Sequence, residues 1–150
     1  MRVLVGGRYN PNRPTVGEPD RGLNKNNVFK VEADKLHYCI VIFRDQEMTL
    51  DEAKLKIAEF NKFHFKDLRL RISNLFLDPE SKTPIIVIRR FTTQEKAMEY
   101  YDTTVTKTNS FLGKKVDFDL YPVTQFNYRE ILRKRDLQDY DSFFKDNYLN

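Results

Sequence analysis

Hydrophobic and polar positions follow two different periods along this chain, and the changes of period predict its elements. The run from Leu36 to Phe43 is almost continuously apolar, which is typical of a strand with both faces covered. After Thr49, apolar residues and a histidine recur at spacings of three and four: Leu50, Ala53, Ile57, Phe60 and His64. This spacing places them on one side of a helix. The pattern therefore predicts a central strand followed by an amphipathic helix.

The next stretch repeats this order with an added hairpin. From Asp67 to Leu77 the period is two, with Leu68, Leu70 and Ile72 on one side, which predicts a half-exposed strand. Residues 78–82 have turn chemistry and lead into the apolar run from Pro84 to Phe91, so the two strands form an antiparallel hairpin. A second helix follows with an inward face made of Ala97, Met98, Tyr101 and Val105.

Both helices begin at a Thr-x-x-Glu motif, Thr49 to Glu52 in the first and Thr92 to Glu95 in the second. In such a motif the threonine oxygen accepts from a free amide of the first turn, and the glutamate side chain accepts from the threonine amide. The motifs therefore predict the residue at which each helix begins.

A last strand and two short helices complete the pattern. Val116 to Val123 alternates, and Pro122 removes a donor near its end, so we expect this strand at a sheet edge. Two helices follow at about 127–133 and from 136, the second carrying Leu137, Tyr140, Phe144 and Tyr148. Eight of the twenty Phe and Tyr residues lie between Phe118 and Tyr148, which indicates an appendix that packs over the sheet or the helices.

The order of elements predicts an α+β fold. It is the ferredoxin-like split βαβ plan, β-α-β-β-α-β with an antiparallel sheet, extended by C-terminal helices at about 127–148. We place this domain at residues 28–150. Residues 1–27 hold four of the five glycines and three of the six prolines, which predicts a flexible linker or tail, with a basic arm as the alternative. This fold alone decides no function, because it serves enzymes, nucleic-acid binders and interaction modules.

Charge argues against a nucleic-acid partner. The chain has a net charge of +4, but residues 1–27 hold five basic and two acidic residues, which leaves residues 28–150 nearly neutral. A domain that binds phosphate backbones carries a strongly positive face. The strand from Ile85 to Arg90 also lacks the glycine and aromatic residues that RNA-recognition folds place there. RNA binding is therefore a low-ranking alternative.

The chain shows no motif for catalysis, metal binding or cofactor binding. Cys39, the single cysteine, lies inside an apolar run and is expected to be a core thiol. His37 and His64 are expected to be core or partly solvated side chains, since two histidines without suitably spaced carboxylates make no metal site. Phosphate-binding glycine motifs and catalytic serine or zinc motifs are missing from the sequence. We therefore predict no enzymatic activity and no cofactor.

Exposed arginines give the only candidate contact surface. Arg69 and Arg71 alternate with apolar residues, and we expect them to form a basic ridge with Arg89 or Arg90. The chain has no apolar run long enough to cross a bilayer and no signal-peptide core, so the sequence itself carries no targeting signal.

Several landmarks together resemble the C-terminal domain of the Bacteroidetes tetratricopeptide lipoproteins of gliding motility and type IX secretion, the SprE or PorW type. They are His37-Tyr38 opening an apolar strand, Phe60-Asn61-Lys62 with Phe63 and Phe65 ending the first helix, Lys96-Ala97-Met98-Glu99-Tyr100-Tyr101 in the second helix, and Phe143-Phe144-Lys145-Asp146-Asn147-Tyr148 near the end. The similarity runs from about Val28 to the C-terminus.

The resemblance implies a non-catalytic accessory domain of a cell-envelope protein on the periplasmic side of the outer membrane. Its partners would be proteins of the secretion or motility machinery, and no cofactor or catalytic residue is carried over. The family's upstream helical repeats and lipidated N-terminus lie outside this sequence. The run from Val87 to Ala97 also looks like a peptidoglycan-binding SPOR domain, whose sheet face binds glycan, and this is the alternative reading.

Overall fold

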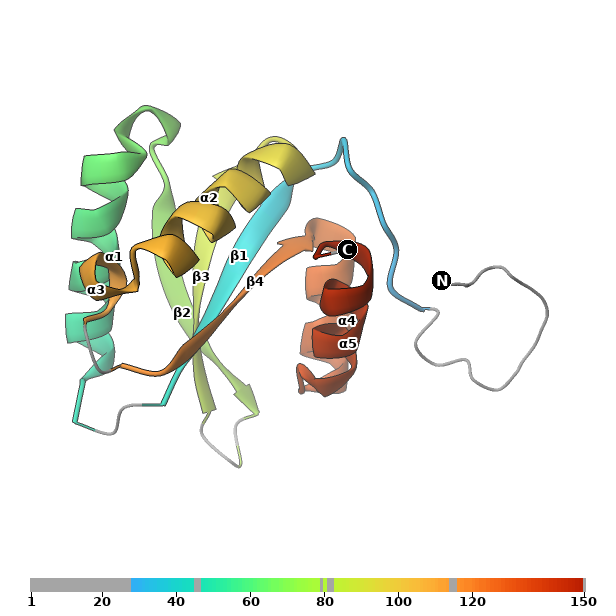
Figure 1. Cartoon of the computed structure of the whole chain (residues 1–150). Coiled ribbons are helices and arrows are strands. Elements are labelled where there is room, and N and C mark those ends of the chain that lie inside the picture. The colour runs from blue at the N-terminus through green and yellow to red at the C-terminus, as the bar shows by residue number, and fades with distance from the viewer. Residues whose placement is uncertain (1–27, 45–46, 79, 81–82, 114–115, 150) are drawn as a thin grey trace. The chain divides into compact units, whose positions relative to one another are not determined.

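The computed structural model describes residues 28–44, 47–78, 80, 83–113 and 116–149 (Figure 1). The predicted linker at 1–27 lies outside the described residues. The chain divides into two compact units, each of which is treated by itself below. One unit contains the described residues 28–31 and 137–149, and the other runs from Glu32 to Asp136. The predicted domain at 28–150 spans both units.

The larger unit contains an antiparallel sheet in the order β2-β3-β1-β4. Its strands are β1 (His37–Phe43), β2 (Arg71–Asp78), β3 (Thr83–Phe91) and β4 (Phe118–Thr124). The ferredoxin-like plan is therefore confirmed, with β1 and β3 in the centre and β4, which contains Pro122, at an edge as predicted. The β2–β3 hairpin is also confirmed, and Glu80 N–H donates to Asp78 Oδ1 at 3.1 Å in its turn.

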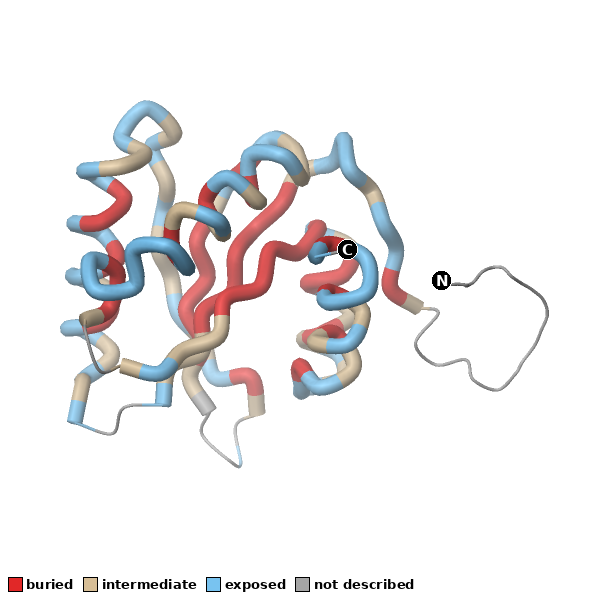
Figure 2. Tube along the Cα trace, viewed as in Figure 1, coloured by how far each residue is buried: buried red, intermediate tan, exposed pale blue. Residues whose placement is uncertain are grey.

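Two helices, α1 (Leu50–His64) and α2 (Gln94–Thr106), cover one face of this sheet. The core between them contains side chains from all layers: Cys39, Val41, Ala53, Ile57, Phe60, Ile86, Ile88, Phe91, Ala97, Tyr100 and Leu120. Buried residues run along the central strands in Figure 2. Cys39 is fully buried as predicted, and burial raises the pKa of its thiol.

A β-bulge at Arg90 decides which residues of β3 enter this core. His37 pairs with Phe91 and Tyr38 pairs with Arg89, so Arg90 is an extra residue on β3. Regular alternation from Ile88 would place Arg90 among the helices and Phe91 on the other face. The bulge shifts the alternation, and Phe91 is buried while Arg90 is exposed.

The N-terminus of α1 is the predicted one, but that of α2 begins one residue later. Glu52 N–H donates to Thr49 Oγ1, and Thr49 N–H donates to Glu52 Oε1, so the capping box is present. In α2 the cap is Thr93, whose Oγ1 accepts from Lys96 N–H at 3.2 Å. The predicted box from Thr92 to Glu95 is wrong. The N–H of Gln94 is taken by Ala33 O at 2.9 Å, which fixes Gln94 as the first helical residue.

Two alanine substitutions show which of the two threonines caps α2. We expect Thr93→Ala to lower the free energy of unfolding by about 0.5–2 kcal/mol, because a first-turn amide loses its acceptor. The exposed neighbour Thr92 provides the matched control. Thr92→Ala should stay within about 0.5 kcal/mol of the parent. Urea unfolding of both variants measures the difference, and a larger loss in Thr92→Ala would show that the helix begins at the earlier threonine.

Three further details differ from the sequence pattern. The segment at 66–68 is a 3₁₀ turn, η3 (Lys66–Leu68), and Arg69 follows in the left-handed region with φ 51, so β2 begins later than Asp67. The buried face of α2 is Ala97, Tyr100 and Thr104, whereas the predicted Val105 is exposed. A short helix, α3 (Thr108–Phe111), follows α2 although the pattern predicted no helix between the second helix and the last strand, and its Phe111 is buried.

Helix α4 (Gln125–Lys134) packs on β1 and β4 on the sheet face away from α1 and α2. The Tyr128 ring meets the Tyr38 ring edge to face at 5.2 Å. The Arg89 guanidinium lies 5.2 Å from the centre of the Tyr38 ring, and its Nη2 donates to Ser73 Oγ at 3.1 Å. Burial raises the pKa of Tyr128. The predicted packing of the C-terminal aromatic residues over the sheet is thus confirmed for α4.

The smaller unit is built around helix α5 (Gln138–Asn147). All four residues of its predicted stripe are buried: Leu137, Tyr140, Phe144 and Tyr148. Phe29 contacts the helix through an edge-to-face pair with Tyr140 at 5.2 Å and a tilted pair with Phe143 at 5.5 Å. The aromatic residues of the closing landmark therefore form the core of this unit.

His37 is a buried, neutral side chain on β1. It is fully shielded from solvent, and its Nδ1 lies 2.8 Å from Lys35 O. A carbonyl oxygen only accepts, so Nδ1 carries the proton. Burial lowers the pKa of His37, although the bond to Lys35 O and the charge of Glu32 act in the opposite direction. The prediction of a core histidine is confirmed.

We expect the free energy of unfolding to fall as the pH is lowered from about 7 to about 5. Because the folded pKa of His37 lies below its unfolded value, full stability is present above that unfolded value. It is lost as the pH falls through the lower folded value. Urea unfolding across this range should show a smaller fall for His37→Gln than for the parent. Equal slopes in the two proteins would contradict the expectation.

Candidate functional site

The last two turns of α1 contribute to two cavities, one on each side of the helix. The first, the Phe63 groove, has a volume of about 550 Å³ and is lined by Glu59, Phe60, Phe63, His64, Thr106, Lys107, Thr108, Asn109 and Ser110. The second, the basic pocket, has a volume of about 230 Å³ and is lined by Ala58, Asn61, Lys62, Phe65, Lys66, Arg69, Leu70 and Ile72. Because an α-helix has 3.6 residues per turn, residues that are adjacent in sequence face different sides of the helix.

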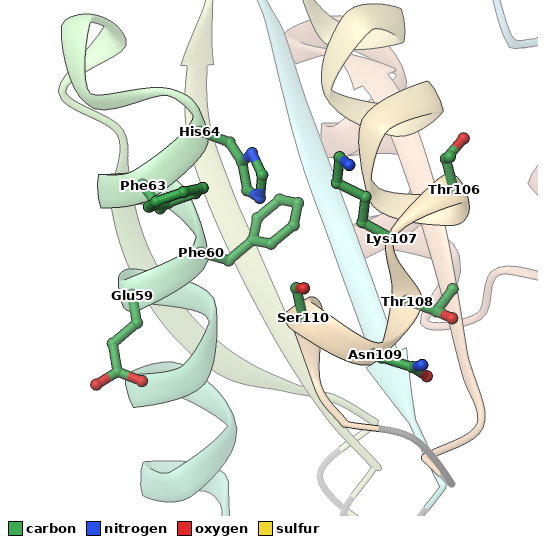
Figure 3. Close-up of a pocket in the computed structure, with 9 residues that line it drawn as sticks. All are labelled: Glu59, Phe60, Phe63, His64, Thr106, Lys107, Thr108, Asn109 and Ser110. Carbon is green, nitrogen blue, oxygen red and sulfur yellow. The ribbon is translucent and has the colours of Figure 1, made fainter.

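Figure 3 shows the Phe63 groove between α1 and the junction of α2 with α3. Phe60 and His64 point into it from α1, and Lys107 and Ser110 point into it from the opposite wall. Glu59 points away from this space. The junction is fixed by backbone bonds, since Lys107 N–H donates to Thr103 O at 3.0 Å and Ser110 N–H donates to Lys107 O at 3.0 Å.

A row of three rings connects the surface of the groove to the core. Phe63 is 82% exposed, and its ring meets the His64 ring edge to face at 4.8 Å. His64 in turn lies 4.5 Å from the ring of Phe60, which is buried and contacts Phe111 at 5.1 Å. Phe63 is therefore connected to the core through ring contacts, although its own side chain is exposed. A large exposed apolar side chain beside a recess is a common feature of contact surfaces.

The groove brings a histidine and a serine to one recess but does not join them. A serine nucleophile needs its base within hydrogen-bond reach. Among the described residues, neither His64 nor Ser110 has a hydrogen bond to the other. The described part of the chain also has no group of three or more His, Cys, Asp and Glu residues placed to hold a metal ion. The groove therefore offers mainly apolar contact.

The basic pocket is walled by three cations from successive pieces of chain. Lys62 belongs to the last turn of α1, Lys66 to η3, and Arg69 directly follows η3. In the described ranges none of the three forms an ion pair. Its remaining lining is largely apolar, so the pocket combines positive and apolar side chains.

Asn61 connects the lining of this pocket to α2. The hydroxyl of Tyr100 donates to Asn61 Oδ1 at 2.6 Å, and both side chains are buried. Burial raises the pKa of Tyr100 well above its usual value. Asn61 Nδ2 is buried without a hydrogen-bond partner in the described structure. Two landmarks far apart in sequence, on α1 and α2, are therefore joined by one hydrogen bond.

The four arginines predicted as a contact ridge lie in three different settings. Arg71 and Arg89 are cross-strand partners in the β2–β3 register, and Arg89 is held over Tyr38. Arg90 occupies the bulge, and Arg69 lines the basic pocket. The structure thus brings Arg71 and Arg89 together and gives Arg69 a different neighbourhood. Their role in contacting a partner stays a prediction.

No known family, curated protein or solved structure matches the chain. In the described part of the structure, no helix combines the length and the apolar character needed to cross a membrane.

The functional candidates that sequence reasoning missed are Phe63 and the residues that face it. The groove depends on α3, which the periodicity did not indicate. One signal was available, because Phe63 lies outside the stripe of Ala53, Ile57 and Phe60 that α1 buries. A large aromatic residue off the buried stripe indicates an exposed ring.

Proposed function

We propose that this domain is a non-catalytic protein-interaction module whose Phe63 groove receives an apolar or aromatic side chain of a partner polypeptide. The exposure of Phe63 carries the proposal: its ring is 82% exposed at the edge of a cavity of about 550 Å³. Aromatic residues at the centre of a contact commonly supply most of the binding energy. The polar groups of the opposite wall, Lys107 and Ser110, would bind the partner's backbone.

The resemblance described above supports a place for this module in the secretion and gliding-motility machinery of the Bacteroidetes cell envelope. The landmarks on α1 and α2 form one cluster, in which Phe60 and Phe65 contact Tyr100 at 6.0 and 5.0 Å. Phe63 is the aromatic landmark of α1 that this cluster leaves exposed. The buried landmarks would then maintain the scaffold, and Phe63 would contact the partner.

The arrangement favours a protein partner over the two other candidates. Glycan on a SPOR-type sheet and bases on an RNA-recognition sheet both need an open sheet face. Here Tyr38 on the central strand is covered by Tyr128 and Arg89. Sedimentation with purified peptidoglycan and salt-dependent binding to single-stranded RNA test these alternatives directly.

Site-specific photocrosslinking tests the proposed function. A photoreactive phenylalanine analogue is placed at position 63 of the native protein in a gliding Bacteroidetes bacterium. The matched control position is Phe76, which is 53% exposed on the edge strand β2. We expect adducts with an envelope protein from position 63 and few from position 76. Phe63→Ala should weaken binding of the purified partner about tenfold or more. Equal adducts from both positions, or none from position 63, would contradict the proposal.

A further inference from the structure

The exposed side of α1 carries two large apolar side chains eight residues apart. Leu55 is 62% exposed and Phe63 is 82% exposed. Residues four apart form a continuous ridge on a helix surface, so Leu55, Glu59 and Phe63 share one ridge. At a rise of 1.5 Å per residue, the two apolar side chains lie about 12 Å apart along the helix axis. Exposed apolar side chains on one ridge indicate a contact surface.

Charged residues of opposite sign continue this row at its two ends. Asp51 lies four residues before Leu55, in the first turn of α1, and Lys66 lies three residues after Phe63, in η3. Neither Asp51 nor Lys66 forms an ion pair among the described residues. All five residues of the row are exposed: Asp51, Leu55, Glu59, Phe63 and Lys66. The order along the row is therefore acidic, apolar, acidic, apolar, basic.

This order is self-complementary when one copy of the chain is reversed against another. A two-fold contact brings the same surface of both copies together, so each residue pair occurs twice. With the two-fold axis near Glu59, Leu55 of each copy meets Phe63 of the other. The same reversal brings Asp51 next to Lys66 of the second copy at both ends of the contact. Apolar and charged positions are thus matched together.

The centre of such a contact places the two copies of Glu59 near each other. Lys56 and Lys62 lie three residues before and three residues after Glu59, and both are exposed. Side chains three residues apart are neighbours on a helix surface, so lysines of both copies surround the two carboxylates. Ala58, which is also exposed, is small and allows the two helices to approach closely. The lysines therefore offset the repulsion at the centre.

We propose that the partner polypeptide of the Phe63 groove is a second copy of this chain, bound through an antiparallel contact between two α1 helices. Leu55 of each copy enters the groove beside Phe63 of the other, and Asp51 pairs with Lys66 across the contact. The inference rests on the proposed function, because it names the partner of the same groove. One crossing of two helices is small beside the roughly 1,200–2,000 Å² that stable interfaces bury, so the dimer dissociates on dilution.

Sedimentation equilibrium over a concentration series tests the dimer. We expect the parent to change from monomer to dimer as its concentration rises. Leu55→Ala should weaken dimerisation about tenfold or more, because each substitution removes two contacts from a two-fold interface. Leu55 is exposed and lies outside the groove lining, so its loss leaves the fold and the groove intact. The matched control is Phe76→Ala, since Phe76 is 53% exposed on β2, and it should dimerise as the parent does.

Disulfide trapping tests the antiparallel register. Asp51→Cys and Lys66→Cys variants are mixed under oxidising conditions, in which the fully buried Cys39 takes no part. We expect covalent dimers from the mixture and few from either variant alone, because the two copies of each position lie at opposite ends of the contact. In the control mixture Asp102→Cys, at an exposed acidic position of α2, replaces Asp51→Cys and should give few covalent dimers.

The outcomes separate this inference from the proposed function. The inference is wrong if the chain stays monomeric throughout the series, if Leu55→Ala dimerises as the parent does, or if one cysteine variant alone gives as many covalent dimers as the mixture. The photocrosslinks from position 63 then decide on the proposed function. Adducts with a different protein would leave that function standing, and a lack of adducts would contradict both proposals.

Discussion

Replacement of Phe60 by alanine is expected to lower the free energy of unfolding by about 3–5 kcal/mol. The side chain is buried, and its ring contacts four others: His64, Phe65, Tyr100 and Phe111. Its removal leaves a cavity between α1, α2 and α3 that the surrounding rings cannot fill. A loss of this size is a large share of the total stability of a small domain, which is about 5–15 kcal/mol.

The chain provides a matched control three residues further along the same helix. Phe63 is also a phenylalanine in α1, but it is 82% exposed. Phe63→Ala should change the free energy of unfolding by less than about 0.5 kcal/mol. Urea or guanidinium unfolding of both variants measures the contrast. Similar losses in the two variants would show that Phe63, too, is packed in solution, and would remove the basis of the Phe63 groove.

Replacement of Tyr100 by phenylalanine is expected to lower the free energy of unfolding by about 1–3 kcal/mol. The substitution keeps the ring but removes the hydroxyl that donates to Asn61 Oδ1 at 2.6 Å. Since Asn61 Nδ2 is already without a partner, the variant leaves the whole buried amide unpaired in the described structure. Most of the loss in free energy of unfolding comes from the buried Asn61 amide that is left without a partner, and less comes from the hydrogen bond itself.

A double variant separates these two contributions. Asn61→Leu combined with Tyr100→Phe replaces both polar partners by apolar groups, and such a replacement can be nearly neutral. We therefore expect the double variant to be more stable than Tyr100→Phe alone. A loss equal to the sum of the two single losses would mean that the two residues act independently. Thermal unfolding of the four proteins provides the comparison.

The helix starts show how far local sequence determines this fold. Thr49 and Glu52 form the predicted capping box, because both partners lie within one turn. The sequence Thr92-Thr93-Gln94-Glu95 offers two threonines, and the choice between them is made by Ala33 O, which accepts from Gln94 N–H. That carbonyl lies about sixty residues earlier in the chain. The order of the strands in the sheet could be predicted from the order of elements along the chain. Which of two adjacent threonines caps a helix depends instead on tertiary contacts.

The same limit applies to the two cavities. The periodicity of α1 predicts which side of the helix is buried, and Ala53, Ile57 and Phe60 are buried as expected. It cannot predict that residues 106–110 form the opposite wall of the groove, because that wall depends on where α2 ends and α3 begins. Asn61, a polar residue, was not expected in the core. Its burial became understandable only with Tyr100 beside it.

The bulge at Arg90 has a consequence for how this domain can vary in evolution. Arg90 is the extra residue of β3, between Arg89, which pairs with Tyr38, and Phe91, which pairs with His37. Loss of Arg90 alone would straighten the strand and still leave Phe91 facing the helices. Loss of a residue within the paired stretch from Ile86 to Ile88 would instead move apolar side chains to the wrong face. Among descendants of this sequence, a one-residue gap in β3 is therefore expected to fall at Arg90.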